Sequence, residues 1–157
     1  MKKLSMFLGM TFLVASAMFL QNCKNGVKKG CGETKISKSG EKESHNNGKN
    51  CMTCHVESGD GDGCFVVAGS AYKSDKSSPA SSGSIKLYTE ANGGGTLKHT
   101  IQIDQNGNFY TTENIDMTGL FPSIDLGGNV QHMSTQPGTG ACNSCHGVTT
   151  EKLWGTN

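Results

Sequence analysis

The sequence predicts a mainly β protein, folded as a sandwich of two sheets, and three observations support this. No run of ten or more residues in the body of the chain shows helical periodicity. Short runs rich in β-branched and aromatic residues recur instead, with partial two-residue alternation and with Gly, Ser, Asn and Asp between them. Only 34% of the 157 residues are hydrophobic, so the core of this single domain should be thin.

Residues 1–22 have the form of a secretory signal peptide. Two lysines precede an apolar stretch that runs from Leu4 to Leu20, and Gln21 and Asn22 end this stretch too early for a permanent membrane span. We therefore expect export of the protein.

The signal ends in "LQNC", which resembles the lipobox of bacterial lipoproteins, with Leu20 three places before Cys23. Asn22 departs from the small residue that is usual there. The resemblance implies lipidation of Cys23; cleavage nearby without a lipid, or an uncleaved anchor, are the alternatives. A lipidated protein would be periplasmic or at the cell surface, and attached to a membrane.

Residues 23–50 are predicted to form a polar tether between this anchor and the body. Apart from Val27 and Ile36 they contain almost no apolar side chain, and they are rich in Lys, Ser, Gly and Asn. As a flexible coil, some twenty of these residues would hold the body on the order of 25 Å from Cys23.

Charge is uneven along the chain and argues against nucleic acid as a partner. Residues 24–49 carry seven lysines and three acids, whereas residues 50–157 carry five lysines and ten acids. All fourteen basic residues are lysine, so the forked guanidinium that phosphate and base recognition favours is absent. The acidic body suits a positively charged protein partner.

Four strands are predicted after Cys64, and an Asn-Gly pair in "DQNGN" predicts a tight hairpin turn between the last two. The predicted strands span residues 65–73, 84–90, 97–104 and 108–112.

The segment that contains these strands also carries a family resemblance. "VVAGSAYKSDKSSPASSGSIKLYTEANGG", followed by "TIQIDQNGNFY", is similar to the carboxypeptidase regulatory-like (transthyretin-like) β-sandwich over residues 65–126. That family shows an "sGtVy" strand, a loop with proline, an "a.V.L" strand and a "T...G.F.." hairpin. The resemblance implies a Greek-key sandwich of seven strands that serves as a module and not as a catalyst.

Two copies of Cys-x-x-Cys-His, "CMTCH" and "CNSCH", flank this segment, and the motif is the attachment signature of c-type haem. One turn of chain presents two thiols to the two vinyl groups on one porphyrin edge, and the next residue lies under the iron. The sequence thus predicts two covalent haem c groups, held in short helical or loop segments at both ends of a domain that spans residues 51–157. The expected ligands are Cys51, Cys54, Cys142 and Cys145 for the porphyrins, with His55 and His146 as proximal iron ligands.

Zinc and redox chemistry are the alternatives for the four motif cysteines. A four-cysteine zinc site is compatible with the spacing but leaves the histidine after each pair unexplained. The Cys-x-x-Cys of thioredoxins belongs to a βαβ pattern that is missing here, and structural disulfides complete the options.

Cys31 and Cys64 remain after four cysteines are assigned to haem and Cys23 to lipid. In an oxidising compartment this pair is a natural disulfide, which would close a loop of about thirty residues and contribute roughly 3 kcal/mol. Two unpaired thiols are the alternative.

Three histidines outside the motifs are candidates for the sixth iron ligand. His45 lies six residues before Cys51 and His132 lies ten before Cys142, so each motif has one histidine shortly upstream. Two bis-histidine haems are therefore the leading interpretation. Six extended residues span at most about 20 Å, barely enough to wrap from one haem face to the other, so own-haem and crossed ligation by His45 both stay open.

His99 is most simply a surface histidine on a strand. Met117 and Met133 are the methionine alternatives for the sixth position, and methionine ligation would raise the reduction potential. Met133 adjoins His132, which we prefer as the distal ligand of the second haem.

Both motifs together resemble dihaem c-type cytochromes, and six-coordinate haems have no open position for oxygen or peroxide. This implies an electron carrier and not an enzyme, relaying electrons between redox proteins or to an extracellular acceptor. One alternative is a subunit of a polymeric cytochrome, which crossed ligation by His45 would favour. Another is a haem-containing sensor or binding module with five-coordinate iron; a dihaem peroxidase fits less well because the chain is short.

Overall fold

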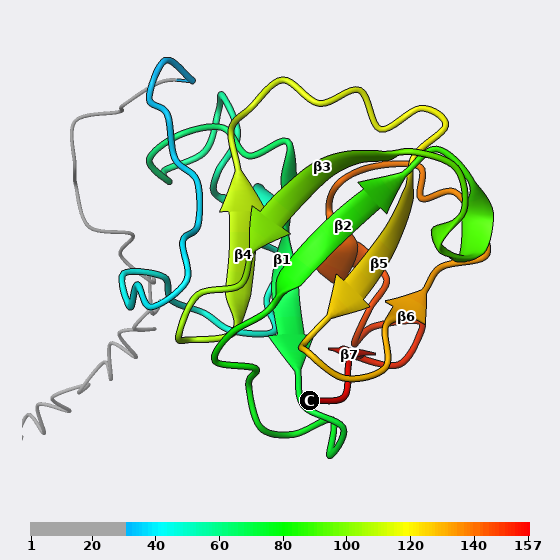
Figure 1. Cartoon of the computed structure of the whole chain (residues 1–157). Coiled ribbons are helices and arrows are strands. Elements are labelled where there is room, and N and C mark those ends of the chain that lie inside the picture. Colours follow the sequence, from blue (N-terminus) through cyan, green and yellow to red (C-terminus); the bar gives the residue numbers. More distant parts are fainter. Residues whose placement is uncertain (1–30) are drawn as a thin grey trace, which may run out of the picture.

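A computed structural model describes residues 31–157, so the predicted signal peptide and Cys23 lie outside the described residues (Figure 1). It contains seven strands and three single turns of 3-10 helix, η1 to η3. The strands are β1 (Val67–Tyr72), β2 (Ser84–Tyr88), β3 (Leu97–Gln102), β4 (Asn108–Thr111), β5 (Phe121–Asp125), β6 (Gln131–His132) and β7 (Leu153–Trp154). The turns are η1 (Cys51–Thr53), η2 (Ala91–Gly93) and η3 (Cys142–Ser144). The predicted mainly β class is confirmed.

The strands form two sheets, one with the order β4-β1-β7 and one with the order β3-β2-β5-β6. In the smaller sheet β1 pairs antiparallel with β4 and parallel with β7. In the larger sheet β2 lies between β3 and β5, antiparallel to both, and β6 extends the edge beyond β5. Within residues 31–157, no helix is long and apolar enough to cross a membrane.

The hydrophobic core lies between the two sheets. Alternate residues of β2, such as Ile85 and Leu87, point inward, while Lys86 between them bonds to Asp125 on the outer face at 2.7 Å. The smaller sheet contributes Val67 and other apolar residues to the same layer. Burying an Ile, Leu or Phe side chain fully contributes about 1.5–3 kcal/mol each. The buried core residues are Val67, Ala71, Ala80, Ile85, Leu87, Ile101, Ile103, Phe109, Ile115, Leu120, Ile124 and Leu126.

The central strand β1 is buried along its whole length, on both faces. Its sequence, "VAGSAY", is rich in small residues, which allow other segments to approach the backbone closely. Val67 and Ala71 belong to the core, whereas Ala68 and Ser70 bond to segments that cover the other face. Those covering segments carry the Cys-x-x-Cys-His motifs.

The four predicted strands correspond to β1 to β4, but the predicted hairpin is wrong. The Asn-Gly turn exists, since the Gly107 amide donates to Asp104 O at 3.1 Å and Gly107 has a φ of 82°. The two strands that it joins nevertheless lie in different sheets, β3 against β2 and β4 against β1. The turn therefore crosses from one layer of the sandwich to the other.

The prediction of a free tether is wrong for residues 31–50, which pack on the edge of β4. Ile36 forms a bridge with Thr111, and the Ser37 amide donates to Tyr110 O at 2.9 Å. Ser37 is 1% exposed despite its polarity. Backbone hydrogen bonds order this segment, which its lack of apolar side chains did not predict.

A disulfide fixes the start of the same segment. Cys31 and Cys64 are bonded, with their Cα atoms 4.7 Å apart, which is the pairing that the cysteine count favoured. Cys64 lies just before β1, so the disulfide joins the first described residue to the sandwich.

Candidate functional site

The two Cys-x-x-Cys-His motifs adopt the same turn. In the first, Cys51 O accepts from the amides of Cys54 at 3.2 Å and His55 at 3.0 Å. In the second, Cys142 O accepts from the amides of Cys145 at 3.3 Å and His146 at 3.0 Å. The hydroxyl at the third motif position also closes each turn, since Thr53 and Ser144 donate to the carbonyls of Asn50 and Ala141 at 2.8 and 2.6 Å.

The two motif histidines are oriented by the same kind of contact. His55 Nδ1 lies 2.8 Å from Asp62 O, and His146 Nδ1 lies 2.9 Å from Glu151 O. A carbonyl oxygen can only accept a hydrogen bond, so Nδ1 carries the proton and Nε2 is left with a lone pair. A metal-ligating histidine has this arrangement in proteins, and here it occurs twice.

The ring of His55 is also held on both faces. Phe65 stacks on one face with ring centroids 4.0 Å apart. On the other face Gly61 is so close that a Cβ there would lie 2.7 Å from His55 Nδ1. The backbone supports this contact, because the Phe65 amide donates to His55 O at 3.0 Å. His55 is therefore immobilised, with its Nε2 edge open.

The second motif is attached directly to β1. The Ala68 amide donates to Gly140 O at 2.9 Å, and Ala68 forms a parallel bridge with Ala141. Gly69 lies against Cys142, so closely that an added Cβ would be 2.9 Å from the Cys142 Cβ. This approach requires glycine in the strand.

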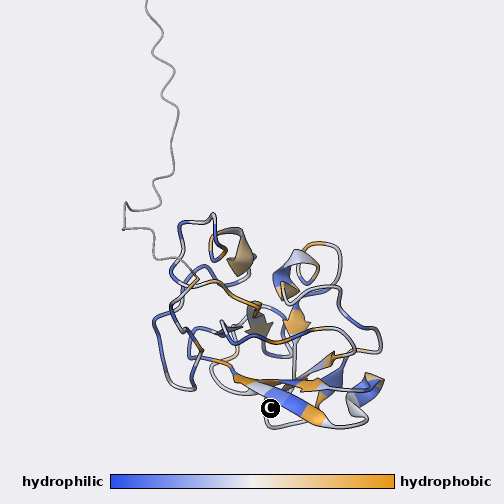
Figure 2. Cartoon of the chain, turned by 90° about the horizontal axis from the view of Figure 1, so that it is seen from above, coloured by the Kyte–Doolittle hydropathy of each residue, from blue (hydrophilic) through white to orange (hydrophobic). Residues whose placement is uncertain are grey.

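The first motif reaches the same strand, so both turns lie together. The Gly48 amide, just before the motif, donates to Ser70 Oγ of β1 at 2.8 Å. Figure 2 shows η1 and η3 on the same side of the molecule, away from η2. Strand β1 contacts both η1 and η3.

A cavity of about 300 Å³ lies beside the first motif and is lined by His45 as well as by Cys51, Cys54 and His55. The rings of His45 and His55 are 6.0 Å apart between centroids, with a tilt of 35° between their planes. Two imidazoles that bind one metal from opposite sides, each at about 2 Å, place their ring centres about 6 Å apart. The spacing therefore fits ligation of one metal by both histidines of the same chain.

The chain reaches this position because it turns back between His45 and Cys51. Asn46 and Gly48 have φ values of 53° and 83°, and the Lys49 amide donates to Asn46 O at 3.0 Å. Six extended residues would barely let His45 and His55 approach one metal from opposite sides. The turn nevertheless places His45 at the same cavity as Cys51, Cys54 and His55.

Asn108 holds this turn from the sandwich. It is 1% exposed, and its Nδ2 donates to Ser44 Oγ at 2.8 Å and to His45 O at 3.2 Å. Its Oδ1 accepts from Ser70 Oγ at 2.6 Å, and its amide donates to Asp104 Oδ1 at 3.0 Å. A buried, bonded network of this kind is rigid, and it ties the position of His45 to β1 and β4.

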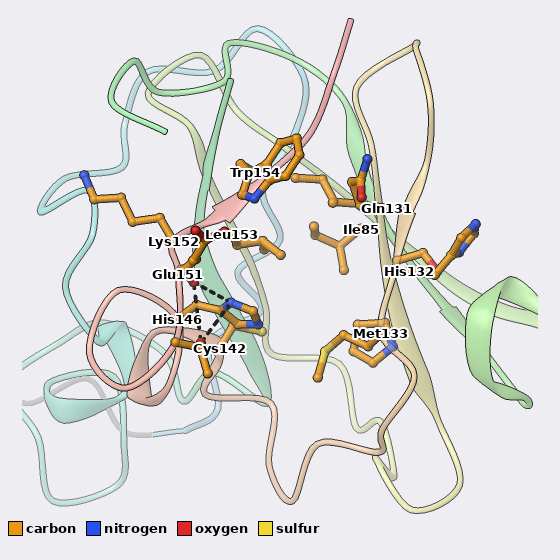
Figure 3. Close-up of a pocket in the computed structure, with 14 residues that line it drawn as sticks. Ile85, Gln131, His132, Met133, Cys142, His146, Glu151, Lys152, Leu153 and Trp154 are labelled. Carbon is orange, nitrogen blue, oxygen red and sulfur yellow. Dashed lines mark hydrogen bonds between the residues drawn. The ribbon is translucent and has the colours of Figure 1, made fainter. Parts of the chain in front are cut away.

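A second cavity, of about 340 Å³, is lined by Cys142 and His146 of the second motif. Figure 3 shows His146 on one side of this cavity and the Met133 side chain on the other, with the Met133 sulfur directed toward His146. The lining is largely apolar and includes Ile85, Pro122, Ile124, Leu153 and Trp154.

His132 does not point into this cavity, although it borders it. Its ring extends away from His146 in Figure 3, and its Nδ1 lies 2.7 Å from Ser123 Oγ on the outer face of the larger sheet. The ring also packs on Gly93, where an added Cβ would be 2.6 Å from Nδ1. The ring of His132, the preferred distal ligand, thus lies on the outer face, and the side chain of its neighbour Met133 lies opposite His146.

The other candidate ligands lie elsewhere. His99 is partly exposed on β3, paired with Leu87. Met117 packs against the hydrophobic core. Neither residue lines the cavities beside the two motifs.

The four motif cysteines are free thiols, and two of them have a raised pKa. Among residues 31–157, no group of three or more His, Cys, Asp or Glu side chains is placed to hold a metal ion. Burial raises the pKa of Cys51, and burial with the charge of Cys51 raises the pKa of Cys142 to about 12. A redox dithiol needs a lowered thiol pKa, so these thiols are poor nucleophiles.

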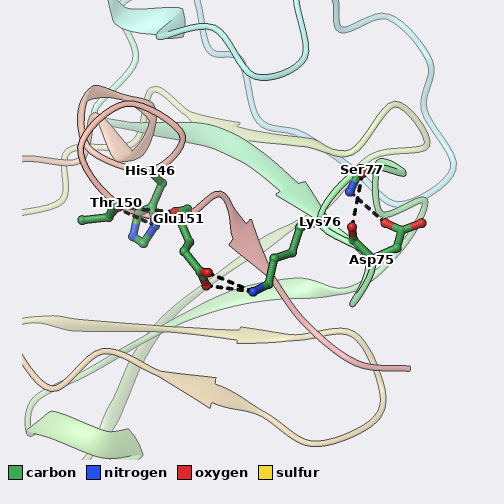
Figure 4. A network of polar contacts seen from close by, with 6 residues as sticks. All are labelled: Asp75, Lys76, Ser77, His146, Thr150 and Glu151. Atoms are coloured by element: carbon green, nitrogen blue, oxygen red, sulfur yellow. Dashed lines mark hydrogen bonds and ion pairs between the residues drawn. The ribbon is translucent and has the colours of Figure 1, made fainter.

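The loop that orients His146 is fastened by an ion pair (Figure 4). Lys76, in the loop after β1, donates to Glu151 Oε1 and Oε2 at 3.0 and 2.9 Å. The carbonyl of the same Glu151 accepts from His146 Nδ1, and Thr150 Oγ1 lies 3.4 Å from that nitrogen. The hydrogen bond from Lys76 also lowers the pKa of the Glu151 carboxyl.

The residues that support the motif side chains were not found from the sequence. Phe65 was assigned to a strand, and Asn108 to a turn, without any role at the site. The glycine-rich "SGDGDG" after the first motif was the one available signal for Gly61, because such loops allow close packing. Nothing in the sequence marks Asn108 as an anchor.

No protein-family model, no curated protein and no solved structure matches this chain. The site is therefore interpreted from its own geometry.

Proposed function

We propose that this chain is an exported dihaem c-type cytochrome that transfers electrons between redox partners. The observation that carries the proposal is the duplication of one geometry: two Cys-x-x-Cys-His turns, each with its histidine Nδ1 bonded to a carbonyl and each beside a cavity. A single such turn is open to several interpretations. Two turns whose histidines make the same hydrogen bond from Nδ1 to a carbonyl support the attachment of two haems.

The residues at each motif suit the attachment of haem. Cys51 and Cys54 would hold the first porphyrin, and Cys142 and Cys145 the second, through thioether bonds. These four residues carry free thiols, which thioether formation requires. When bound, each haem supplies an iron that gains and loses one electron.

Electron transfer is favoured over turnover of a substrate by the position of His45. Its ring faces His55 at the separation that suits one shared metal, which leaves no open site for oxygen or peroxide on that iron. Because this contact lies within one chain, it supports ligation of the chain's own haem over the crossed ligation that would favour a polymeric cytochrome.

The disulfide supports a location outside the cytoplasm. Bonds such as Cys31–Cys64 persist in oxidising compartments and are rare in the cytosol. We propose that the protein is held to a membrane by a lipid on Cys23, eight residues before the first described residue, Cys31. The proposed partners are redox proteins or an extracellular acceptor.

The test is a haem count by mass on protein made in cells that attach c-type haem. The unaltered chain should carry two covalent haems, and C51A/C54A and C142A/C145A should each lose one. The matched control is C31S/C64S, which removes two cysteines but should keep both haems. Protein that matures with no haem, while another c-type cytochrome matures in the same cells, would refute the proposal.

A further inference from the structure

We propose that Met133, and not His132, provides the sixth iron ligand of the second haem, and that the two haems therefore differ in reduction potential. This inference rests on the proposed function. It concerns how the site works, because unequal potentials give electron flow within the protein a direction.

Strand alternation places Met133 inside and His132 outside. His132 is opposite Ser123 in the pairing of β5 and β6, and directly opposed residues share one face of a sheet. The next residue along a strand points to the other face, and the Met133 amide bonds to Pro122 O at 3.0 Å, so pairing continues through this position. Met133 therefore shares the inner face with Gln131 and lines the cavity of the second motif.

The contacts of the His132 ring hold it on the outer face of the sheet and oppose its rotation into the cavity. Its Nδ1 is bonded to the nearly buried Ser123, and its ring fills the space above Gly93. Turning it inward would break these contacts and require a one-residue shift of β6 against β5. The Met133 side chain already points toward His146 and needs no such shift (Figure 3).

The two cavities also differ in polarity, and this difference should raise the reduction potential of the second haem, as a methionine ligand would. More polar and charged residues line the first cavity, which also contacts Phe65 and Tyr110: Lys35, Glu43, Ser44, His45, Asn46, Lys49, Asn50, Thr53, Asp62 and Asn108 are among them. The second is lined by the apolar residues Ile85, Pro122, Ile124, Leu153 and Trp154 and by fewer polar ones, among them Ser123, Gln131, Thr150, Glu151 and Lys152. An apolar shell disfavours the extra positive charge of ferric iron, and a thioether ligand raises the potential relative to imidazole.

Both effects make the second iron the better electron acceptor. One electron would pass from the ferrous iron bound by His45 and His55 to the ferric iron bound by His146 and Met133. The first is oxidised to ferric and the second reduced to ferrous, so the step balances without a further reactant. A reducing partner protein would act at the first motif and an oxidising partner at the second.

The experiment is a redox titration of the purified dihaem protein, with absorption and NMR spectra of the unaltered chain, Met133→Leu and His132→Gln. We expect two separate reduction waves and the thioether–iron charge-transfer band of the ferric form. Met133→Leu should lose that band and the shifted axial-methionine methyl signal of the reduced protein, while His132→Gln keeps both. Met117→Leu is the matched control, because Met117 packs on the core away from both cavities.

A further variant replaces the proposed methionine ligand by a different iron ligand. Met133→His should restore a six-coordinate iron. The higher of the two midpoint potentials should then shift toward the lower one. Two covalent haems with one common wave, no thioether band, and a spectrum that changes only in His132→Gln would overturn this inference and leave the proposed function standing. A protein without covalent haem would refute both.

Discussion

Phe65 stacks on the imidazole of His55, with ring centroids 4.0 Å apart and planes only 9° from parallel. Phe65 in turn stacks on Tyr110 of β4 at 4.8 Å, so a row of three rings links the first motif to the smaller sheet. The orientation of His55 is therefore set by the sandwich and not by the motif alone.

Replacing Phe65 by leucine should loosen His55 while keeping the site apolar. Aromatic stacking contributes about 0.5–1.5 kcal/mol beyond the area buried, so we expect a loss of about 1–2 kcal/mol in the free energy of unfolding. The EPR signal of the ferric first haem, which responds to the angle between its axial imidazole planes, should broaden. Phe121→Leu is the control, and an equal broadening there would refute a specific role for Phe65.

On the other face of the ring, Gly61→Ala should push His55 from its position. The added Cβ would lie within 2.7–2.9 Å of three ring atoms, a distance that the fixed imidazole cannot tolerate. We expect one haem per chain to show an altered spectrum and the second haem to be unchanged. Gly138→Ala serves as control, since a Cβ there has nothing within 4 Å. An unaltered spectrum in Gly61→Ala would contradict the packing described.

His45→Ala should open the first haem to external ligands. Removing the ring that faces His55 leaves one iron five-coordinate, so the reduced protein should bind one CO per chain where the unaltered protein binds none. His99→Ala, on the partly exposed β3 position, should bind no CO. If His45→Ala left both haems six-coordinate, a different ligand would have to be sought.

Gly69→Ala should disturb the second motif through the strand that carries it. The new methyl would meet Phe109 at 2.6 Å and the Cys142 Cβ at 2.9 Å, and overpacking of this kind costs about 1–3 kcal/mol. Chemical denaturation measures the loss. The methionine methyl signal of the second haem should shift in the same variant, whereas the CO binding of the first haem stays absent. A variant as stable as the parent, with unchanged spectra, would refute the close approach.

Reduction or removal of the Cys31–Cys64 bond should destabilise the fold without loss of haem. The two residues are 33 apart in sequence, and closing such a loop contributes about 3–4 kcal/mol in the chain-entropy model. C31S/C64S should therefore melt at a lower temperature. Amide exchange should rise first at Ile36 and Ser37, which pair with the edge of β4. Unchanged exchange at these amides would argue that the hydrogen bonds alone order the segment.

The fold class and the first four strands, β1 to β4, were predictable, because two-residue alternation and turn residues mark them directly. β6 and β7 have two residues each, too few for any periodicity to be visible. The order of residues 31–50 was not predictable from composition, since polar backbone pairing to β4 leaves no trace in hydropathy. The failed hairpin has a similar cause: the Asn-Gly pair predicts a turn but not the sheet that each flanking strand joins.

The motif residues were visible from their spacing, but the distal residues depended on geometry. The proposed choice of Met133 over His132 depends on which face of the sheet each side chain occupies, and this became visible only from the pairing of His132 with Ser123. For His45 the extended-chain estimate left own-haem and crossed ligation open, and it did not include the left-handed Asn46 and Gly48 that fold the chain back toward Cys51.

Both Cys-x-x-Cys-His turns are fastened to the six residues of β1, one through Ser70 and the other through Ala68 and Gly69. The span between the motifs is thus fixed by a single rigid strand and not by the ninety or so residues that separate them in sequence. If the two motifs bind haem as proposed, insertions at the β2–β3 connection would leave the distance between the two haems unchanged. The rate of electron transfer between them would then not depend on the length of that loop.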